Sequence, residues 1–196
     1  NVSDIIGLDY AIIGTNSTWN TALGNNIGIH IQSTGNIIGG TSPGKRNIIS
    51  GNIEIGVDIG YLGDNNEVIG NYVGTNSEGM VAVPNKGGIW IREGNNNKIG
   101  GSAEGARNVV SGNNGNGIWI EGTNSAESSG NIVKGNYVGL GADGATALGN
   151  KEFGIKIRQA SGNLVGGPNL EDRNVVSANG TDGMNRFGIY IEYENS

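Results

Sequence analysis

The chain has 196 residues, no cysteine and a formal net charge of −6, and glycine supplies 38 and asparagine 30 of its residues. The lack of cysteine excludes a disulfide-stapled scaffold, and an acidic balance without clustered lysine and arginine argues against a nucleic-acid partner. No apolar stretch is as long as a membrane-spanning helix, so no membrane insertion is predicted.

Three short signatures follow one another in a fixed order along the chain. The first is Gly-Φ-x-Ile, where Φ is Ile or Val, and it begins at Gly28, Gly56, Gly88, Gly117, Gly154 and Gly188. The second is Asn-x-Φ, which begins at Asn36, Asn66, Asn97, Asn131 and Asn163. The third is Asn-Φ-Φ, which begins at Asn47, Asn71, Asn108, Asn136 and Asn174. A fixed order with variable spacing indicates a constant frame that carries loops of different lengths.

Each signature is typical of a short β-strand with one buried face, because β-branched residues alternate with variable ones. A cycle of roughly thirty residues with three such strands cannot bury its own apolar face, so successive cycles must stack as in a solenoid. The sequence therefore predicts an all-β fold, a parallel β-helix of about five to six coils in which three parallel sheets enclose an Ile/Val core. Residues 1–196 are interpreted as a single such domain and as a segment of a longer repeat protein, with neighbouring coils as its stacking partners.

The asparagines of the second and third signatures predict two side-chain ladders. An inward amide at a corner between sheets can bond backbone groups that the strand pairing leaves unpaired, and also the equivalent asparagine one coil away. The alternative is that asparagine is merely common in turns. The constant register of these residues relative to an inward aliphatic favours the ladders. The first coil departs from the pattern, because Ser3 and Ala11 stand where asparagine is expected.

Alternate coils carry a longer insertion after the third signature, within residues 14–29, 74–89 and 139–155. Each insertion holds a small apolar pair: Ala22/Leu23, Ala82/Val83 and Ala147/Leu148. The outward positions of the third signature are unusually apolar for a solvent face, namely Ile48, Tyr72, Val109, Tyr137 and Val175. We therefore expect the insertions to fold back over that sheet, which gives a two-coil super-repeat of roughly sixty residues.

The phrases NIIGGTSPGKRNIISGN, GNYVGTNSEG and GIWI resemble the repeats of right-handed parallel β-helix proteins of bacterial secreted and cell-surface type, the pectate-lyase-like superfamily fold. The resemblance covers nearly the whole chain. It implies a right-handed coil, in agreement with the general crossover preference, and an extracellular or cell-surface location. It does not select a function, since lyases, hydrolases, epimerases, phage tailspikes and adhesins share this coil.

The centres of the first-signature strands should form one outward file, composed of His30, Asp58, Trp90, Trp119, Lys156 and Tyr190. Residues on adjacent coils of such a file lie within side-chain reach. The first functional hypothesis is polysaccharide or cell-surface glycan binding, as in an adhesin, with sugar rings stacked on aromatic side chains and hydroxyls bonded by charged ones. Its predicted ligand-binding residues are Trp90, Trp119, Tyr190, Arg92, Glu121 and Arg158. The alternative is that the aromatics stack on each other without any ligand.

The second hypothesis is a polysaccharide-active enzyme, either a uronan lyase or a glycoside hydrolase. His30, Asp58 and Arg92, on three successive coils, supply a base, an acid and an anion clamp as weak catalytic candidates. Hydrolases need two carboxylates about 5 to 10 Å apart, and Asp58 has no acidic neighbour in its file. The balance leans against an enzyme.

A third hypothesis is structural, a rigid rod that spaces a binding tip from the cell surface. It is compatible with glycan binding. No cofactor and no metal site are predicted, although calcium at residues 169–173 (NLEDR) stays open because acidic and amide oxygens gather there. Isolated acidic residues in loops are more often simply solvated.

Overall fold

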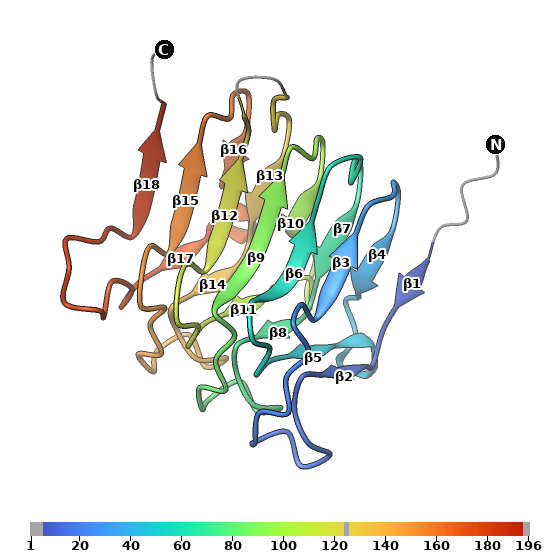
Figure 1. The fold of residues 1–196 in the computed structure, drawn as a ribbon, viewed down its shortest axis with the longest axis vertical. Helices are drawn as coiled ribbons and strands as arrows, with labels where there is room; N and C mark the ends of the chain where they lie inside the picture. The colour runs from blue at the N-terminus through green and yellow to red at the C-terminus, as the bar shows by residue number, and fades with distance from the viewer. Residues whose placement is uncertain (1–5, 124–125, 194–196) are drawn as a thin grey trace.

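The computed structural model describes residues 6–123 and 126–193, which form a parallel β-solenoid of about six turns (Figure 1). Every strand pair is parallel and joins equivalent strands of successive coils, and each sheet has six strands. The two ends of the described chain lie at opposite ends of the stack, with β1 at one and β18 at the other. The fold class predicted from the three signatures is confirmed.

The three sheets correspond to the three signatures. Sheet I holds β3 (Ile29–Ile31), β6 (Ile55–Ile59), β9 (Gly87–Arg92), β12 (Ile118–Glu121), β15 (Ile155–Arg158) and β18 (Ile189–Glu192). Sheet II holds β1 (Gly7–Leu8), β4 (Ile37–Gly39), β7 (Glu67–Ile69), β10 (Lys98–Gly100), β13 (Ile132–Lys134) and β16 (Leu164–Val165). Sheet III holds β2 (Ile12–Ile13), β5 (Ile48–Ile49), β8 (Tyr72–Val73), β11 (Val109–Val110), β14 (Tyr137–Val138) and β17 (Val175–Val176). The helical segments of the described chain are two 3-10 turns, Pro43–Lys45 and Leu170–Asp172.

One apolar core runs through the inside of the solenoid. It is built from inward Ile and Val side chains of all three sheets, such as Ile120, Val133 and Val110, each of which is fully buried. Complete burial of one such side chain stabilises the fold by about 1.5 to 3 kcal/mol. Because each coil contributes only a few of these residues, the core exists only when coils stack, as the repeat length requires.

Both predicted asparagine ladders are present. In each rung, the side-chain Nδ2 of one asparagine donates to Oδ1 of the next, as Asn71 Nδ2 does to Asn108 at 3.3 Å and Asn108 Nδ2 to Asn136 at 3.0 Å. The same Oδ1 also accepts the backbone N–H of the preceding asparagine, at 2.9 Å for Asn71 and Asn108. Nδ2 of Asn108 additionally donates to the carbonyl of Val68, at 2.7 Å. Each amide thus gives a corner backbone N–H its acceptor and adds a side-chain donor to a carbonyl of the preceding coil.

A third ladder, which the sequence analysis missed, lies at the corner between sheets III and I. Its members are Asn52, Asn85, Asn113, Asn150 and Asn179. Here too Nδ2 of each residue donates to Oδ1 of the next, for example Asn52 to Asn85 at 2.9 Å. All three corners of the solenoid are therefore lined by amides.

The departure of the first coil is also seen. Ala11 has no amide side chain, yet its backbone N–H donates to Oδ1 of Asn47 at 2.8 Å, so the ladder of the third signature begins at Asn47. Ser3 lies outside the described residues.

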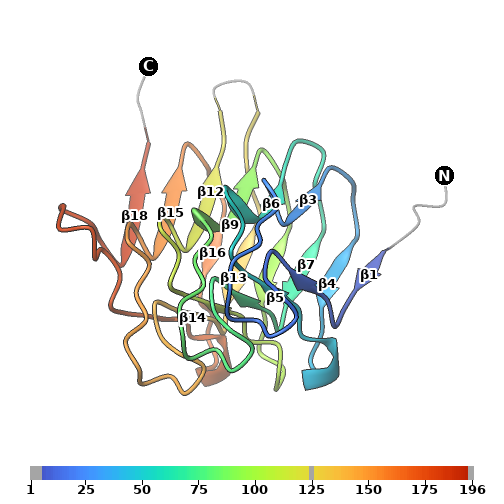
Figure 2. The same cartoon turned by 60° about the horizontal axis from the view of Figure 1, so that its bottom comes forward.

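The long insertions fold back over sheet III, as predicted, and Figure 2 brings this side forward. Each insertion is closed by one antiparallel bridge: Thr15 to Ala22, Thr75 to Ala82 and Leu140 to Ala147. Beneath them a second apolar cluster forms from Ile48, Tyr72 and Val109, with Tyr137 and Ala142 packed against it. The small apolar pairs of the insertions differ in burial, since Val83 is buried whereas Leu23 is exposed.

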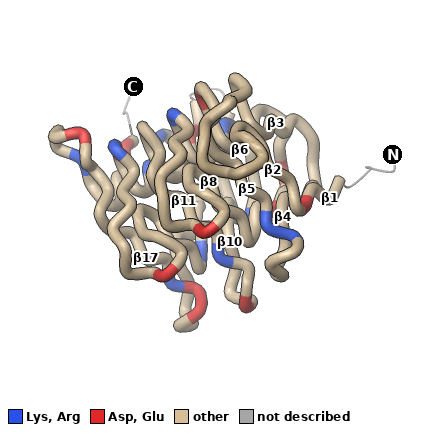
Figure 3. Tube along the Cα trace, turned by 90° about the horizontal axis from the view of Figure 1, so that it is seen from below, with Lys and Arg blue, Asp and Glu red and all other residues tan. Residues whose placement is uncertain are grey.

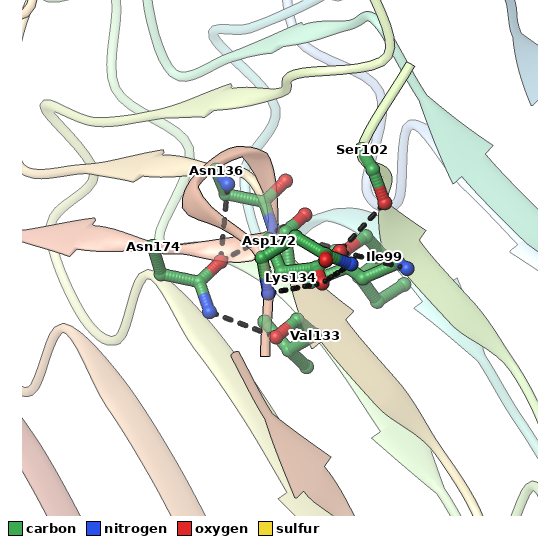
Figure 4. Close-up of polar contacts among 8 residues, drawn as sticks. Ile99, Ser102, Val133, Lys134, Asn136, Asp172 and Asn174 are labelled. Atoms are coloured by element: carbon green, nitrogen blue, oxygen red, sulfur yellow. Dashed lines mark hydrogen bonds and ion pairs between the residues drawn. The ribbon is translucent and has the colours of Figure 1, made fainter. Parts of the chain in front are cut away.

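Asp172, at the end of the second 3-10 turn, ties three successive coils together (Figure 4). Its carboxylate is almost fully buried and accepts hydrogen bonds from Ser102 Oγ at 2.6 Å, from Lys134 Nζ at 3.0 Å and from Asn169 Nδ2 at 2.8 Å. Hydrogen bonds from Ser102 and Lys134 hold the pKa of the Asp172 carboxyl well below its usual value of 3.8. Both oxygens are thus occupied by protein donors, so this carboxylate, part of the segment considered for calcium, is engaged in the fold.

We expect Asp172→Asn to lower the urea midpoint of unfolding at pH 7. Because the pKa is lower in the folded than in the unfolded chain, the carboxylate contributes its full stabilisation above pH 3.8, and this contribution is lost as the pH falls below that value. The difference between wild type and variant should therefore stay constant from pH 7 to about pH 5 and shrink below about pH 4. Glu104→Gln, an exposed change at the same corner, is the control. A difference that persists unchanged at pH 2 would contradict this role of the charge.

Candidate functional site

The predicted outward file of sheet I exists in the predicted order. Register pairs His30 with Asp58, Asp58 with Trp90 and Trp90 with Trp119. The file then continues through Lys156 to Tyr190. A second outward file beside it pairs Arg92 with Glu121, Glu121 with Arg158 and Arg158 with Glu192. The outer face of sheet I therefore carries all of the predicted ligand-binding residues and weak catalytic candidates.

Trp90 and Trp119 stack face to face, with ring centroids 4.4 Å apart and planes 4° apart. Because they stand on adjacent strands, their faces point along the solenoid axis and their edges point outward. The guanidinium of Arg92 lies 4.8 Å from the Trp90 centroid, and Lys156 Nζ lies 5.1 Å from that of Trp119. Ring faces are thus covered by the partner ring and by cations, and the pair presents its aromatic edges outward.

Tyr190 belongs to a separate aromatic group. It stacks on Phe153 at 4.7 Å and lies near Phe187, at 5.7 Å between centroids. Lys156 separates it from the tryptophans, with Nζ 5.8 Å from the Tyr190 centroid. Phe153, which lies in the turn before β15, carries no strand signature, and sequence reasoning therefore missed it.

The three weak catalytic candidates are brought together around Asp58. This carboxylate is almost fully buried; Oδ2 lies 2.8 Å from His30 Nδ1, and Oδ1 accepts from Arg92 Nε at 2.9 Å. Arg92 Nη2 also donates to Asp58, so the arginine contact is bidentate. The hydrogen bond to Asp58 raises the pKa of Arg92. Both oxygens of Asp58 are engaged, so this residue anchors its two neighbours, and only His30 and Arg92 of the trio present surface to solvent.

Charges alternate in sign along the face. Arg158 pairs with Glu121 at 3.4 Å, and Lys156 pairs with Glu192 at 3.5 Å. Burial raises the pKa of the Glu121 carboxyl, and the positive charges of Arg158 and Lys156 oppose that shift. Over the described residues, the face thus carries paired charges of opposite sign and no continuous row of like charges. Viewed from below, on the side of sheet III, short blue and red segments are likewise interspersed (Figure 3).

Two hollows flank the tryptophan pair, and Trp90 lines both. The amino-side hollow, of about 380 Å³, lies where the strands begin, and its polar lining comes from Glu54, Lys86, Asn114, Asn116 and Glu152. The carboxyl-side hollow, of about 340 Å³, lies where the strands end, and it is lined by Gln32, Gly60, Tyr61, Trp90, Arg92, Glu93, Glu121 and Thr123. Each hollow draws residues from four successive coils. With strands about 4.8 Å apart, each extends roughly 14 Å along the axis.

Comparison with known proteins gives no relative. No protein-family model, no curated protein and no solved structure matches this chain. The site is therefore interpreted from its own geometry.

Among residues 6–123 and 126–193, no group of three or more His, Cys, Asp or Glu side chains is placed to hold a metal ion. Within the same part of the chain, no helix has the length and apolar character needed to cross a bilayer.

Proposed function

We propose that this chain is an extracellular β-solenoid module that binds a largely neutral polysaccharide along the outer face of sheet I. The observation that carries the proposal is the pair of hollows on either side of Trp90. Their lining combines aromatic edges with amides, carboxylates and amines, the groups that contact the ring carbons and hydroxyls of sugars. An elongated hollow along the axis suits a chain-like ligand.

Charge pairing supports a neutral ligand. Arg92 is neutralised by Asp58, and Lys86 by Glu54 at 2.6 Å. An acidic glycan would have to compete with these carboxylates for each cation, and the chain as a whole carries a net charge of −6. Hydroxyl groups can accept from the cations and donate to the carboxylates without separating any pair.

The proposal includes a rigid spacer role, which a different observation supports. Three amide ladders and one continuous core hold every described coil to its neighbours. Such a scaffold keeps the hollows in a fixed geometry and limits the entropy lost on binding. The resemblance of the repeats to secreted and surface β-helix proteins of bacteria supports the location.

The test is a panel of soluble neutral and uronic-acid polysaccharides, with affinity measured by calorimetry. We expect the variant carrying Trp90→Ala and Trp119→Ala to bind the neutral ligand at least tenfold more weakly, because both hollows lose their shared wall. The control is Phe187→Ala, an exposed aromatic outside the hollows. Unchanged affinity in the double variant would refute this site.

The same incubations separate binding from catalysis. An intact polysaccharide after prolonged contact agrees with a binding module. Release of shorter chains that stops in His30→Ala would replace the proposal with the enzyme hypothesis, because His30 is the one general base of the Asp58 cluster that solvent reaches.

A further inference from the structure

The first super-repeat differs from the other two at two positions of unusual backbone geometry, one just before β2 and one in its long insertion. Register places Ile12 of β2 in one file with Tyr72 and Tyr137, so the segments 10–19, 70–79 and 135–144 align without gaps. At the first aligned position stand Tyr10, Gly70 and Gly135, with φ of 54°, 72° and 73°. At the last stand Trp19, Gly79 and Gly144, with φ of 61°, 71° and 69°.

Both positions are thus left-handed in every super-repeat, and only the first super-repeat fills them with aromatic residues. At the last position, the first two super-repeats form the same turn. Asn16 Oδ1 accepts the backbone N–H of Asn20 at 3.3 Å, just as Asn76 Oδ1 accepts that of Met80 at 3.0 Å. A bulky residue with positive φ costs free energy that glycine avoids, and such strain concentrates at functional sites. Six other non-glycine residues of the described chain also have positive φ, among them Leu62 and Glu93, but Tyr10 and Trp19 are the two aromatic ones and they line the same hollow.

The two aromatic residues line one hollow of about 170 Å³ between the first and second insertions. Its floor is formed by Ile12 and Ile48, and its remaining polar lining is Arg46 and Ser77. In the next pair of insertions this space is closed, because the backbone N–H of Ala142 donates to the carbonyl of Gly79 at 3.0 Å. Among the described residues, no corresponding bond joins Ser77 to Trp19. The hollow therefore opens where tryptophan replaces glycine.

The chemistry of the lining selects the ligand. Tyr10 and Trp19 are 75% and 38% exposed, so their rings are accessible from the hollow. Arg46 Nε donates to the carbonyl of Gly70 and its guanidinium lies over the Tyr72 ring, so Arg46 offers the N–H groups of its two Nη atoms. Trp19 presents an indole N–H, and Tyr10 and Ser77 present hydroxyls, whereas no carboxylate or amide side chain of the described chain lines the space. A sugar ring has several hydroxyl groups that each need an acceptor as well as a donor, whereas the hydroxyls of Tyr10 and Ser77 are the only side-chain acceptors among the described residues that line this space. A proline-rich segment has apolar rings, carbonyl acceptors and few N–H groups, and it keeps an extended conformation at low entropic cost.

We propose that this hollow, defined by Tyr10, Trp19, Arg46 and Ser77, is a docking site for a proline-rich peptide in the polyproline II conformation. One proline ring packs between the two aromatic rings over Ile12, and neighbouring carbonyls accept from the indole and guanidinium N–H groups. Pockets for drug-sized ligands occupy about 300 to 1,000 Å³, so this smaller hollow suits one such ring. The site lies on sheet III and is independent of the polysaccharide proposed for sheet I.

The test uses a fluorescein-labelled decaproline peptide and measures fluorescence anisotropy against the whole chain. We expect saturable binding that Trp19→Gly weakens at least tenfold. Tyr10→Gly should weaken it similarly. Because each change installs the residue of the other two super-repeats, the urea midpoint should stay equal or rise, which a purely structural role of these aromatics would not allow. Trp90→Ala, on sheet I, is the control and should leave peptide binding unchanged.

Three results would overturn the proposal. One is the absence of saturable decaproline binding up to millimolar protein concentrations. The second is equal affinity for decaproline and for a labelled Gly-Ser peptide of the same length. The third is binding of neutral oligosaccharides, in place of the peptide, that is lost in Trp19→Gly.

Discussion

Replacing Asn108 with alanine is expected to lower the free energy of unfolding by about 3 to 5 kcal/mol, because each buried polar group left without a partner costs about 1 to 3 kcal/mol. Asn108 is fully buried at the centre of its ladder. Alanine would leave the backbone N–H of Asn71 without its acceptor and Oδ1 of Asn136 without its side-chain donor, and it would remove the side-chain donor to the carbonyl of Val68. Urea denaturation followed by circular dichroism measures the loss.

Asn20→Ala provides the matched control for this ladder change. Asn20 is an exposed asparagine in the first insertion, and surface changes of this kind stay within about 0.5 kcal/mol. If Asn108→Ala were as mild as this control, the ladders would be a by-product of turn composition and not a source of stability.

Replacing Arg92 with leucine is expected to cost about 3 kcal/mol, because it leaves the buried carboxylate of Asp58 with His30 as its only remaining side-chain partner among the described residues. Removing one member of a buried ion pair typically costs 3 to 5 kcal/mol, and the remaining histidine places this case at the lower end. The measurement is again the urea midpoint at pH 7.

The double variant with Arg92→Leu and Asp58→Val separates charge from packing. Replacing a whole buried pair by apolar residues is often nearly neutral, and valine suits a central strand. We therefore expect the double variant to recover most of the loss. A double variant at least as unstable as Arg92→Leu would indicate that the arginine stem, which covers Trp90, supplies the stabilisation through packing.

Strand positions were predictable from the sequence because their pattern is strict. The alternation around Ile118 and Ile120 fixes which side chains are inside, and identical spacing in each coil fixes the register that places Trp90 beside Trp119. The two ladders at the starts of strands were predictable for the same reason. In a parallel stack, residues at equivalent positions of successive repeats become direct neighbours.

The third ladder escaped prediction because its spacing has two values. Asn52 follows Asn47 by five residues, whereas Asn85 follows Asn71 by fourteen, since a long insertion intervenes in every second coil. The Thr75 to Ala82 bridge shows that the insertion leaves and rejoins the coil at one point. The sequence alone does not contain this information, so it does not show that Asn52 and Asn85 are equivalent.

The hollows escaped prediction for a different reason. Their walls come from corner residues such as Tyr61 and Asn116, which follow no period, and their shape depends on side-chain directions. The face-to-face stacking of the tryptophans likewise required rotamers that a repeat pattern does not contain. Register specified which residues meet, and packing decided how they meet.

The direction of the amide ladders gives the solenoid an electrical polarity. In all three columns, each Nδ2 donates to the Oδ1 of the coil that follows in the chain, and each Oδ1 accepts from the Nδ2 of the coil that precedes it. The side-chain dipoles therefore add along the axis, and each hydrogen bond polarises the next one in its column. The two ends of the solenoid are therefore chemically different. Each column ends in an amide donor at the C-terminal end and in an amide acceptor at the N-terminal end.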